Sequence, residues 1–313
     1  MSLNKKEEID YEEYESLKQS RFKQQKLPGW RVLPSMFNAM SFFFSIGILS
    51  IGVGIPLFIF SGEIVRYEID FSNSNCTNLN ITKKMKADIM VYYKVYNFYQ
   101  NNRRYMYSKS LDQLYGKNFS AKEMRDRHEC DPIVTNKDLG IDDKTTKLNN
   151  DSLAIPCGLI AKSFKLFNDT YTLQYANKTN IKINSTNIAR KYDREHYKNQ
   201  INPAEQWLDI EDEHFMVWMR TAPFSNFTKF YGRIEEDIDE GSSLNVCITH
   251  GKYYDEEEYN QSDINKTLIL TTVNSFGVSN NELAYTFGGV GALCIILGII
   301  FIFAFKFQDK KDR

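Results

Sequence analysis

Residues 37–61 read FNAMSFFFSIGILSIGVGIPLFIFS, a run without a single charged side chain. A second such run, YTFGGVGALCIILGIIFIFAF, occupies residues 285–305. As a helix with ~1.5 Å of rise per residue, each run is long enough to cross a hydrocarbon core of ~30 Å. The polar segment between the runs then lies on one side of the membrane. We therefore predict a two-pass membrane protein with one large central domain.

The first run is too long for the apolar core of a cleavable signal peptide, and a long polar tail precedes it. Basic residues flank the outer ends of both runs, at Lys26, Arg31, Lys306, Lys310, Lys311 and Arg313. Because short basic flanks favour the cytosol, we expect both termini to be cytosolic. The predicted order is cytoplasmic tail (1–36), first span (37–61), lumenal or extracellular domain (62–284), second span (285–305) and cytoplasmic tail (306–313).

Candidate glycosylation sequons of the form N-x-S/T support this orientation. They lie at Asn75, Asn80, Asn118, Asn168, Asn177, Asn184, Asn226, Asn260 and Asn265. All of these lie between the two spans and none lies in a tail. The central domain is therefore predicted to be a lumenal or extracellular glycoprotein.

Cysteine usage fits the same compartment. The central segment holds Cys76, Cys130, Cys157 and Cys247, whereas Cys294 lies inside the second span. Four cysteines in an oxidising compartment indicate two disulfides, with three possible connectivities. The alternative of a zinc site lacks a C-x-x-C pair or a histidine-rich spacing. We expect Cys294 to act as a small apolar side chain within a helix.

The central domain has the residue pattern of a mainly β structure. Short runs rich in Val, Ile, Tyr, Phe and Thr alternate with clusters of Asn, Asp, Gly and Ser. The runs that we expect to form strands are residues 89–99, 169–175, 214–220, 243–249 and 267–273. Their spacing favours antiparallel sheets in a sandwich-like arrangement. The polar, acidic residues 136–151 are predicted to form an exposed insertion.

The sequence offers no recognisable catalytic chemistry. It contains no glycine-rich phosphate loop, no G-x-S-x-G and no H-E-x-x-H. The four histidines are far apart and lack the spacing of metal ligands. The net charge of −1 gives no basic field for nucleic acid. We therefore predict no catalytic residue, no metal, no cofactor and no nucleic-acid partner, so the chain is not expected to be an enzyme.

Three weaker patterns concern packing. Ser50-x-x-x-Gly54 and Gly288-x-x-x-Ala292 are small-residue pairs that permit close approach of membrane helices. Trp30, next to basic residues, is typical of an anchor at the membrane interface, and the alternative is a docking segment for a partner. Trp218 and Met219 are expected in a core, with Arg220 paired, because an unpaired buried guanidinium is costly.

Four segments resemble one known family, the cell-cycle-control-protein-fifty and ligand-effect-modulator-three family. They are FKQQKLPGW (22–30), NFYQNNRRYMYSKSLDQLYG (97–116), IPCGLIAKSFKLFND (155–169) and EHFMVWMRTAPFSNFTKFYGRI (213–234). They occur in the family order around two spans at the family positions, so the resemblance covers nearly the whole chain. The most specific part of the resemblance is a pair of motifs. One is PCGLIA-x-S followed by FND, and the other is E-x-F-x-V-W-M-R-T-A.

The resemblance implies a non-catalytic accessory (beta) subunit. Its partner would be the catalytic alpha subunit of a P-type phospholipid flippase, in a heterodimer that contacts membrane lipids. It would support the folding, endoplasmic-reticulum exit and activity of that subunit, which moves phospholipids to the cytosolic leaflet. The resemblance also implies that the chain resides in the endoplasmic reticulum, in the Golgi or endosomes, or in the plasma membrane.

The resemblance also implies a disulfide between Cys130 and Cys157, which leaves Cys247 as the spare partner for Cys76. Many family members carry extra cysteines soon after the first span, where this chain has Cys76 alone. The segment before the second span also departs from the family, because it reads VSNNELAY where the family is usually rich in glycine. Contacts made there with a partner are expected to differ.

Two other classes of protein share this topology. A trimeric ligand-gated channel can have two spans, cytosolic tails and a large outer domain, although such channels usually carry many more cysteines in that domain. A cell-surface receptor fits the topology but matches no motif. The size of the native complex distinguishes these alternatives, because a channel is a homotrimer and the flippase subunit pairs with a chain of a different kind.

Overall fold

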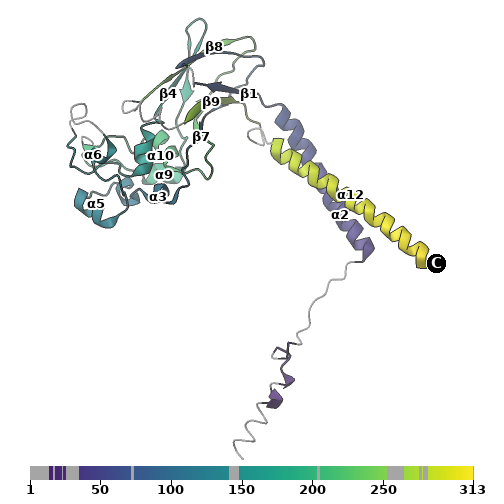
Figure 1. Ribbon diagram of the computed structural model, residues 1–313. Helices are drawn as coiled ribbons and strands as arrows, with labels where there is room; N and C mark the ends of the chain where they lie inside the picture. Colours follow the sequence, from purple (N-terminus) through teal and green to yellow (C-terminus); the bar gives the residue numbers. More distant parts are fainter. Residues whose placement is uncertain are drawn as a thin grey trace, which may run out of the picture. The chain divides into compact units, whose positions relative to one another are not determined.

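The computed structural model describes residues 14–16, 18–22, 24–25, 35–71, 74–140, 148–202, 205–251, 264–274, 277 and 281–312. The chain forms two compact units (Figure 1). Met1–Pro56 and Glu282–Arg313 make up the first unit, which holds most of the two long helices. Leu57–Asn281 is the second unit, called the central domain below. The predicted interface anchor, Trp30, lies outside the described residues.

The two long helices are α2 (Met36–Gly62) and α12 (Asn281–Asp312). Each contains one of the apolar runs and is long and apolar enough to cross a membrane. Only 17% and 11% of their apolar windows are buried inside the structure. A core helix of a soluble protein hides far more of its surface, so these largely uncovered helices suit a lipid environment. The predicted pair of flanking membrane helices is confirmed.

Glycines line the contact between the two long helices. A Cβ atom added to Gly47 would lie 3.2 Å from the carbonyl oxygen of Gly291, and one added to Gly54 would lie 3.2 Å from the nitrogen of Gly288. Backbones this close are typical of small-residue membrane interfaces. The predicted small residues therefore bring the helices together, with one correction: Ala292 is exposed, and Gly291 takes its place at the contact.

The central domain contains two antiparallel sheets, as the sequence predicts. One has five strands in the order β1-β9-β3-β7-β6, and the other has four in the order β2-β8-β4-β5. The strands are β1 (Arg66–Asp70), β2 (Cys76–Asn80), β3 (Ile89–Tyr96), β4 (Thr170–Tyr175), β5 (Asn180–Ile181), β6 (Ile183–Asn184), β7 (Phe227–Ile234), β8 (Ser243–Thr249) and β9 (Asn265–Thr271). Four of the five predicted strand segments overlap β3, β4, β8 and β9.

Alternating burial explains why these segments are strands. Every second residue of β3 is buried, starting at Ile89, and β8 shows the same period from Leu244. Such a period of two directs one face of each strand into a core and the other outward. The two sheets meet through aromatic side chains: the rings of Tyr171 on β4 and Tyr231 on β7 have centroids 4.9 Å apart. The arrangement is sandwich-like.

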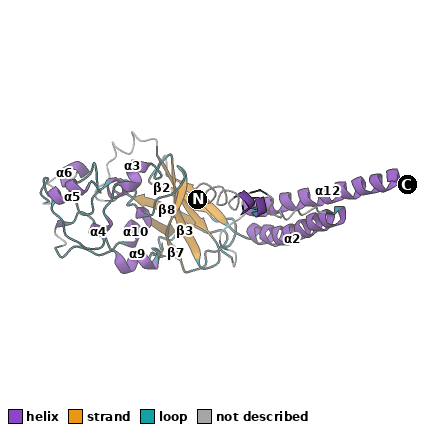
Figure 2. Cartoon of the chain, turned by 90° about the horizontal axis from the view of Figure 1, so that it is seen from below, coloured by secondary structure: helices purple, strands orange, loops and turns teal. Residues whose placement is uncertain are grey.

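The central domain also contains short helices whose positions the sequence did not predict, and these lie together beside the sheets (Figure 2). They are α3 (Arg103–Tyr107), α4 (Leu111–Leu114), α5 (Ala121–Arg127), α6 (Asn136–Leu139), α8 (Leu159–Phe164), α9 (Lys191–His196) and α10 (Glu213–Met219). Each has four to seven residues. Helices of one or two turns are too short to establish a 3.6-residue period.

The predicted strand at 214–220 is wrong, because these residues form helix α10 and its C-cap. Asp212 caps the helix by accepting a hydrogen bond from the backbone nitrogen of His214 at 3.0 Å. The buried residues Phe215, Trp218 and Met219 are spaced at i, i+3 and i+4, which places them on one helical face. A strand would have needed alternation, which this segment lacks.

Trp218 lies at the centre of the core formed by the short helices. It is completely buried, and its indole nitrogen donates to the carbonyl oxygen of Ile160 at 3.1 Å. Its ring stacks on Phe167 with a centroid distance of 4.3 Å. The expected core position of Trp218 is therefore observed. The predicted exposed insertion at 136–151 is only partly exposed, because Asn136 and Leu139 are buried. Its residues 141–147 lie outside the described residues.

Candidate functional site

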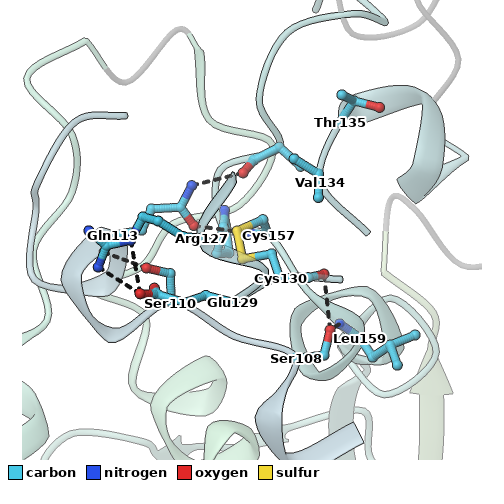
Figure 3. Close-up of a disulfide and its surroundings, with 12 residues drawn as sticks. Ser108, Ser110, Gln113, Arg127, Glu129, Cys130, Val134, Thr135, Cys157 and Leu159 are labelled. Carbon is cyan, nitrogen blue, oxygen red and sulfur yellow. Dashed lines mark hydrogen bonds and ion pairs between the residues drawn. A yellow bond between two sulfur atoms is a disulfide. The ribbon is translucent and has the colours of Figure 1, made fainter. Parts of the chain in front are cut away.

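A disulfide joins the family-like segment 155–169 to Cys130, which lies just after α5. Cys130 and Cys157 are bonded, with Cα atoms 5.7 Å apart, and both are buried (Figure 3). Beside the bond, the hydroxyl of Ser108 donates to the carbonyl oxygen of Cys130 at 3.1 Å. The same hydroxyl accepts from the backbone nitrogen of Leu159 at 2.8 Å. One buried serine thus connects the chain before α4 to both sides of the disulfide.

Gln113 and Gly158 strengthen this connection. The Gln113 side chain donates to the carbonyl of Ala154 and accepts from the nitrogen of Cys157, both at 2.9 Å. Gly158 has a φ of +100°, and a Cβ added there would lie 2.1 Å from the carbonyl oxygen of Ser108. Only glycine allows the backbones to approach this closely. The buried side of residues 97–116 is therefore fixed against residues 155–169.

The second disulfide lies within a sheet. Cys76 on β2 and Cys247 on β8 are register partners and are bonded, with Cα atoms 4.1 Å apart. The bond joins residues 171 positions apart in the sequence. It therefore fixes the edge strand β2 to the rest of the four-stranded sheet. The Cys130–Cys157 pairing is the one that the family resemblance implies, and Cys76–Cys247 is the pairing that elimination leaves.

The opposite side of residues 97–116 is exposed. Tyr99 is 64% exposed, Tyr107 71%, Leu111 46% and Met106 36%. Met106, Tyr107 and Leu111 line a hollow of about 410 Å³. Folding alone does not explain apolar side chains on this surface, and clustered exposed apolar groups often mark a binding surface. We call this the 106–111 hollow.

Most charges around the 106–111 hollow are already balanced. Arg127 contacts Glu129 at 2.6 Å and Asp112 at 2.9 Å, and Lys117 contacts Asp112 at 2.8 Å. These four side chains form one neutral network. Lys109, which also lines the hollow, donates to no acceptor among the described residues. Burial lowers the pKa of the Lys109 ammonium, the nearby Arg220 charge lowers it further, and the Asp193 carboxylate acts in the opposite direction.

Arg220, which the sequence predicted to be paired, has a specific partner. Its Nε and Nη2 atoms donate to the two carboxylate oxygens of Asp193 at 2.8 and 2.6 Å. The side chain of Asp193 is only 4% exposed. This bidentate pair joins the end of α10 to α9. No sequence spacing identifies Asp193 as the partner, because 27 residues separate the two positions.

Lys165, Lys229 and Lys266 are buried in the central domain, and the last two have informative partners. Lys266 forms an ion pair with Asp169 at 2.6 Å, and both side chains are 2% exposed. His250 Nδ1 lies 2.7 Å from the other Asp169 oxygen. Lys229 donates to the carbonyl oxygens of Val217 and Arg220 at the end of α10. Burial lowers the pKa of Lys229 to about 7.

The structure describes all but one of the predicted glycosylation sequons, since Asn260 lies outside the described residues. Six of the asparagines are exposed, at Asn75, Asn80, Asn118, Asn177, Asn226 and Asn265. Asn168 and Asn184 are half-buried. One further sequon, Asn150-Asp151-Ser152, fits the same N-x-S/T pattern and was not among those predicted. Asn150 is half-buried as well.

Two other hollows are more polar than the 106–111 hollow. One, of about 450 Å³, is lined by Glu68, Asp70 and two sequon residues, Asn226 and Asn265. Glycans on these two asparagines would occupy its rim. The other, of about 550 Å³, lies between α5 and residues 148–153. In the part of the chain that the structure describes, no three His, Cys, Asp or Glu side chains are placed to hold a metal ion.

Comparison with known proteins agrees with this architecture. The family described as "LEM3 (ligand-effect modulator 3) family / CDC50 family" matches residues 3–311. "Putative ALA-interacting subunit 2" of Arabidopsis thaliana is 32% identical over 90% of this chain and 86% of its own length. "ALA-interacting subunit 3" of the same plant is 31% identical over 94% and 87%. "Cell cycle control protein 50A" of Mus musculus is 29% identical over 90% and 86%. The chain belongs to the LEM3/CDC50 family.

Proposed function

We propose that this chain is the non-catalytic accessory subunit of a P-type ATPase that moves phospholipids to the cytosolic leaflet. The observation that carries the proposal is the family match over residues 3–311. Two similar plant proteins bear the name ALA-interacting subunit, which describes proteins that act by binding a partner. ATP hydrolysis and the aspartyl phosphate belong to the partner chain, so this chain is not an enzyme.

The fold suits such a role. Most of the apolar surface of α2 and α12 is left uncovered when the two helices pack together. That surface is available to lipid and to the membrane helices of a partner. The central domain presents rigid sheets held by a disulfide, and such a domain can cover the short outward loops of a membrane ATPase. We infer one copy of each subunit in the complex.

The same proposal sets the orientation and the route through the cell. Both tails are cytosolic and the central domain is lumenal or extracellular, where disulfides form and sequons are glycosylated. Assembly in the endoplasmic reticulum permits the partner to leave for the Golgi, endosomes or plasma membrane. The chain therefore supports the folding and export of the ATPase as well as its transport cycle.

Co-expression with the ATPase tests the proposal. The two chains should co-purify in detergent as a heterodimer, and the ATPase should leave the endoplasmic reticulum only when this chain is present. Uptake of labelled phospholipid should fall in cells that lack the chain and have no substitute subunit. Normal uptake in those cells would refute the proposal. A homotrimer that carries a ligand-gated current by itself would support the channel alternative instead.

A further inference from the structure

The 106–111 hollow combines an apolar floor with one ammonium group, that of Lys109, which donates to no acceptor among the described residues. Met106, Tyr107 and Leu111 provide the apolar surface, and Lys109 stands among them. The remaining charged residues of the hollow belong to the neutral network around Arg127. An occupant that complements this surface needs an apolar side chain for the floor and a carboxylate for Lys109.

The hollow is preformed on a rigid base. On the buried side of the hollow, the Ser108 hydroxyl forms hydrogen bonds with the backbones of Cys130 and Leu159. The backbone of Gly158 also packs closely against Ser108 and Lys109. Asn102 caps α3 by accepting from the backbone nitrogen of Arg104 at 3.0 Å. A surface already held in its binding conformation loses little conformational entropy on binding. Rigid support of this kind is typical of a binding surface.

We propose that the 106–111 hollow binds an outward loop of the partner ATPase through an apolar side chain next to an Asp or Glu. The apolar side chain contacts Met106 and Leu111, and the carboxylate accepts a hydrogen bond from the Lys109 ammonium. The inference rests on the proposed function and adds the place and chemistry of one contact. Desolvation by the apolar neighbours strengthens the ion pair relative to one in water.

Charge argues against a second copy of this chain as the occupant. A two-fold interface places the same patch on both sides, so two copies would bring their Lys109 side chains together. Like charges facing each other across an interface are costly. The nearby Asp193 carboxylate already accepts two hydrogen bonds from Arg220, so a second copy offers no spare anion there. An acidic loop from a different chain complements the charge of Lys109, whereas a second copy of this chain does not.

The first test reverses the charge at Lys109. With the full-length chain co-expressed with the tagged ATPase, Lys109→Glu should reduce the co-purified fraction by at least about 10-fold, because it replaces an attraction by a repulsion. Lys109→Arg keeps the charge and should co-purify like the unsubstituted chain. Leu111→Asp, which puts a carboxylate on the apolar floor, should give a similar loss. The thermal midpoint of each variant alone checks that folding is unchanged.

The second test adds a glycan to the hollow. Tyr107→Asn combined with Lys109→Thr creates a sequon across Ser108, and an attached glycan should block the loop. Glu240→Asn creates a matched sequon with Gly241 and Ser242 on the exposed turn between β7 and β8. The first glycan should abolish co-purification, whereas the second should leave it intact. Equal losses from both glycans would contradict a contact specific to the hollow.

The outcomes separate this inference from the proposed function. If the unsubstituted chain does not bind the ATPase, the proposed function fails. If it binds and the Lys109→Glu and Leu111→Asp chains bind equally well, only the hollow is refuted as the contact. A homodimer of the free chain that Leu111→Asp dissociates would assign the hollow to a second copy and overturn the inference.

Discussion

Replacing Asp169 by asparagine should destabilise the central domain more than most single substitutions. Asp169 and Lys266 are each 2% exposed and lie 2.6 Å apart. Lys266 also donates to the carbonyl oxygen of Leu166, and His250 contacts the second oxygen of Asp169. Asp169→Asn keeps the shape of the side chain but leaves the Lys266 ammonium buried without an opposing charge.

Removing one partner of a buried ion pair costs about 3–5 kcal/mol, because the remaining charge is desolvated and uncompensated. For a domain of roughly 150–250 residues, 1 kcal/mol lowers the thermal midpoint by about 2–4 °C. Asp169→Asn should therefore lower the midpoint by about 6–20 °C. Adding Lys266→Met should restore part of this loss, since the double variant contains no buried cation at that position.

The pH dependence gives a further check. Burial already lowers the pKa of Lys266, and Asp169 acts in the opposite direction. Without the carboxylate, the pKa of Lys266 falls further, so the penalty is complete below that value and shrinks as pH rises and the lysine loses its proton. Differential scanning fluorimetry of the purified full-length chain at several pH values measures this. A single variant as stable as the unsubstituted chain, or a double variant less stable than Asp169→Asn alone, would refute the reasoning.

Two further predictions concern Lys229 on β7 and the Cys130–Cys157 disulfide. Burial lowers the pKa of Lys229 to about 7 from an ordinary 10.5. Between these two pH values the lysine is protonated in the unfolded chain and neutral in the folded chain. The free energy of unfolding should therefore rise with pH in this range. Denaturant titrations give the free energy of unfolding of the unsubstituted chain and of Lys229→Met. The difference between the two should shift by about 2 kcal/mol in favour of the unsubstituted chain from pH 7 to pH 9. A difference that does not change with pH would contradict this. Cys157→Ser opens a bond between residues 27 positions apart and should cost ~3.5 kcal/mol. Limited proteolysis should then cleave the chain around Cys130 faster, and equal cleavage rates would count against a stabilising role.

Features with a strong local or compositional signal could be predicted from the sequence. The two spans follow from uncharged runs longer than twenty residues, which few soluble structures contain. The strands β3 and β8 follow from alternation, because each buries one face. The pairing of Cys130 with Cys157 was implied by the resemblance to a known family. The spacing of the four cysteines alone leaves three connectivities open.

Features that depend on long-range contacts could not be predicted. Helix α10 holds a run of apolar residues in the segment predicted as a strand, and it packs against β7, α9 and the more distant α8. The partners of Arg220 and Lys266 come from positions 27 and 97 residues away. The 106–111 hollow arises where two segments, 106–112 and 127–129, meet, so no single stretch of sequence describes it.

The segment 97–116 shows how one stretch can serve both folding and binding. Its inward residues, Ser108 and Gln113, hydrogen-bond to the backbone around the Cys130–Cys157 disulfide, so changing them would disturb the fold. Its outward residues, such as Tyr107, contribute little to that core and remain accessible. Loss of binding after a change at Tyr107 with stability intact is therefore a direct sign of an interface, whereas the same loss after a change at Ser108 is not. The structure thus tells which substitutions in this segment can separate assembly from folding.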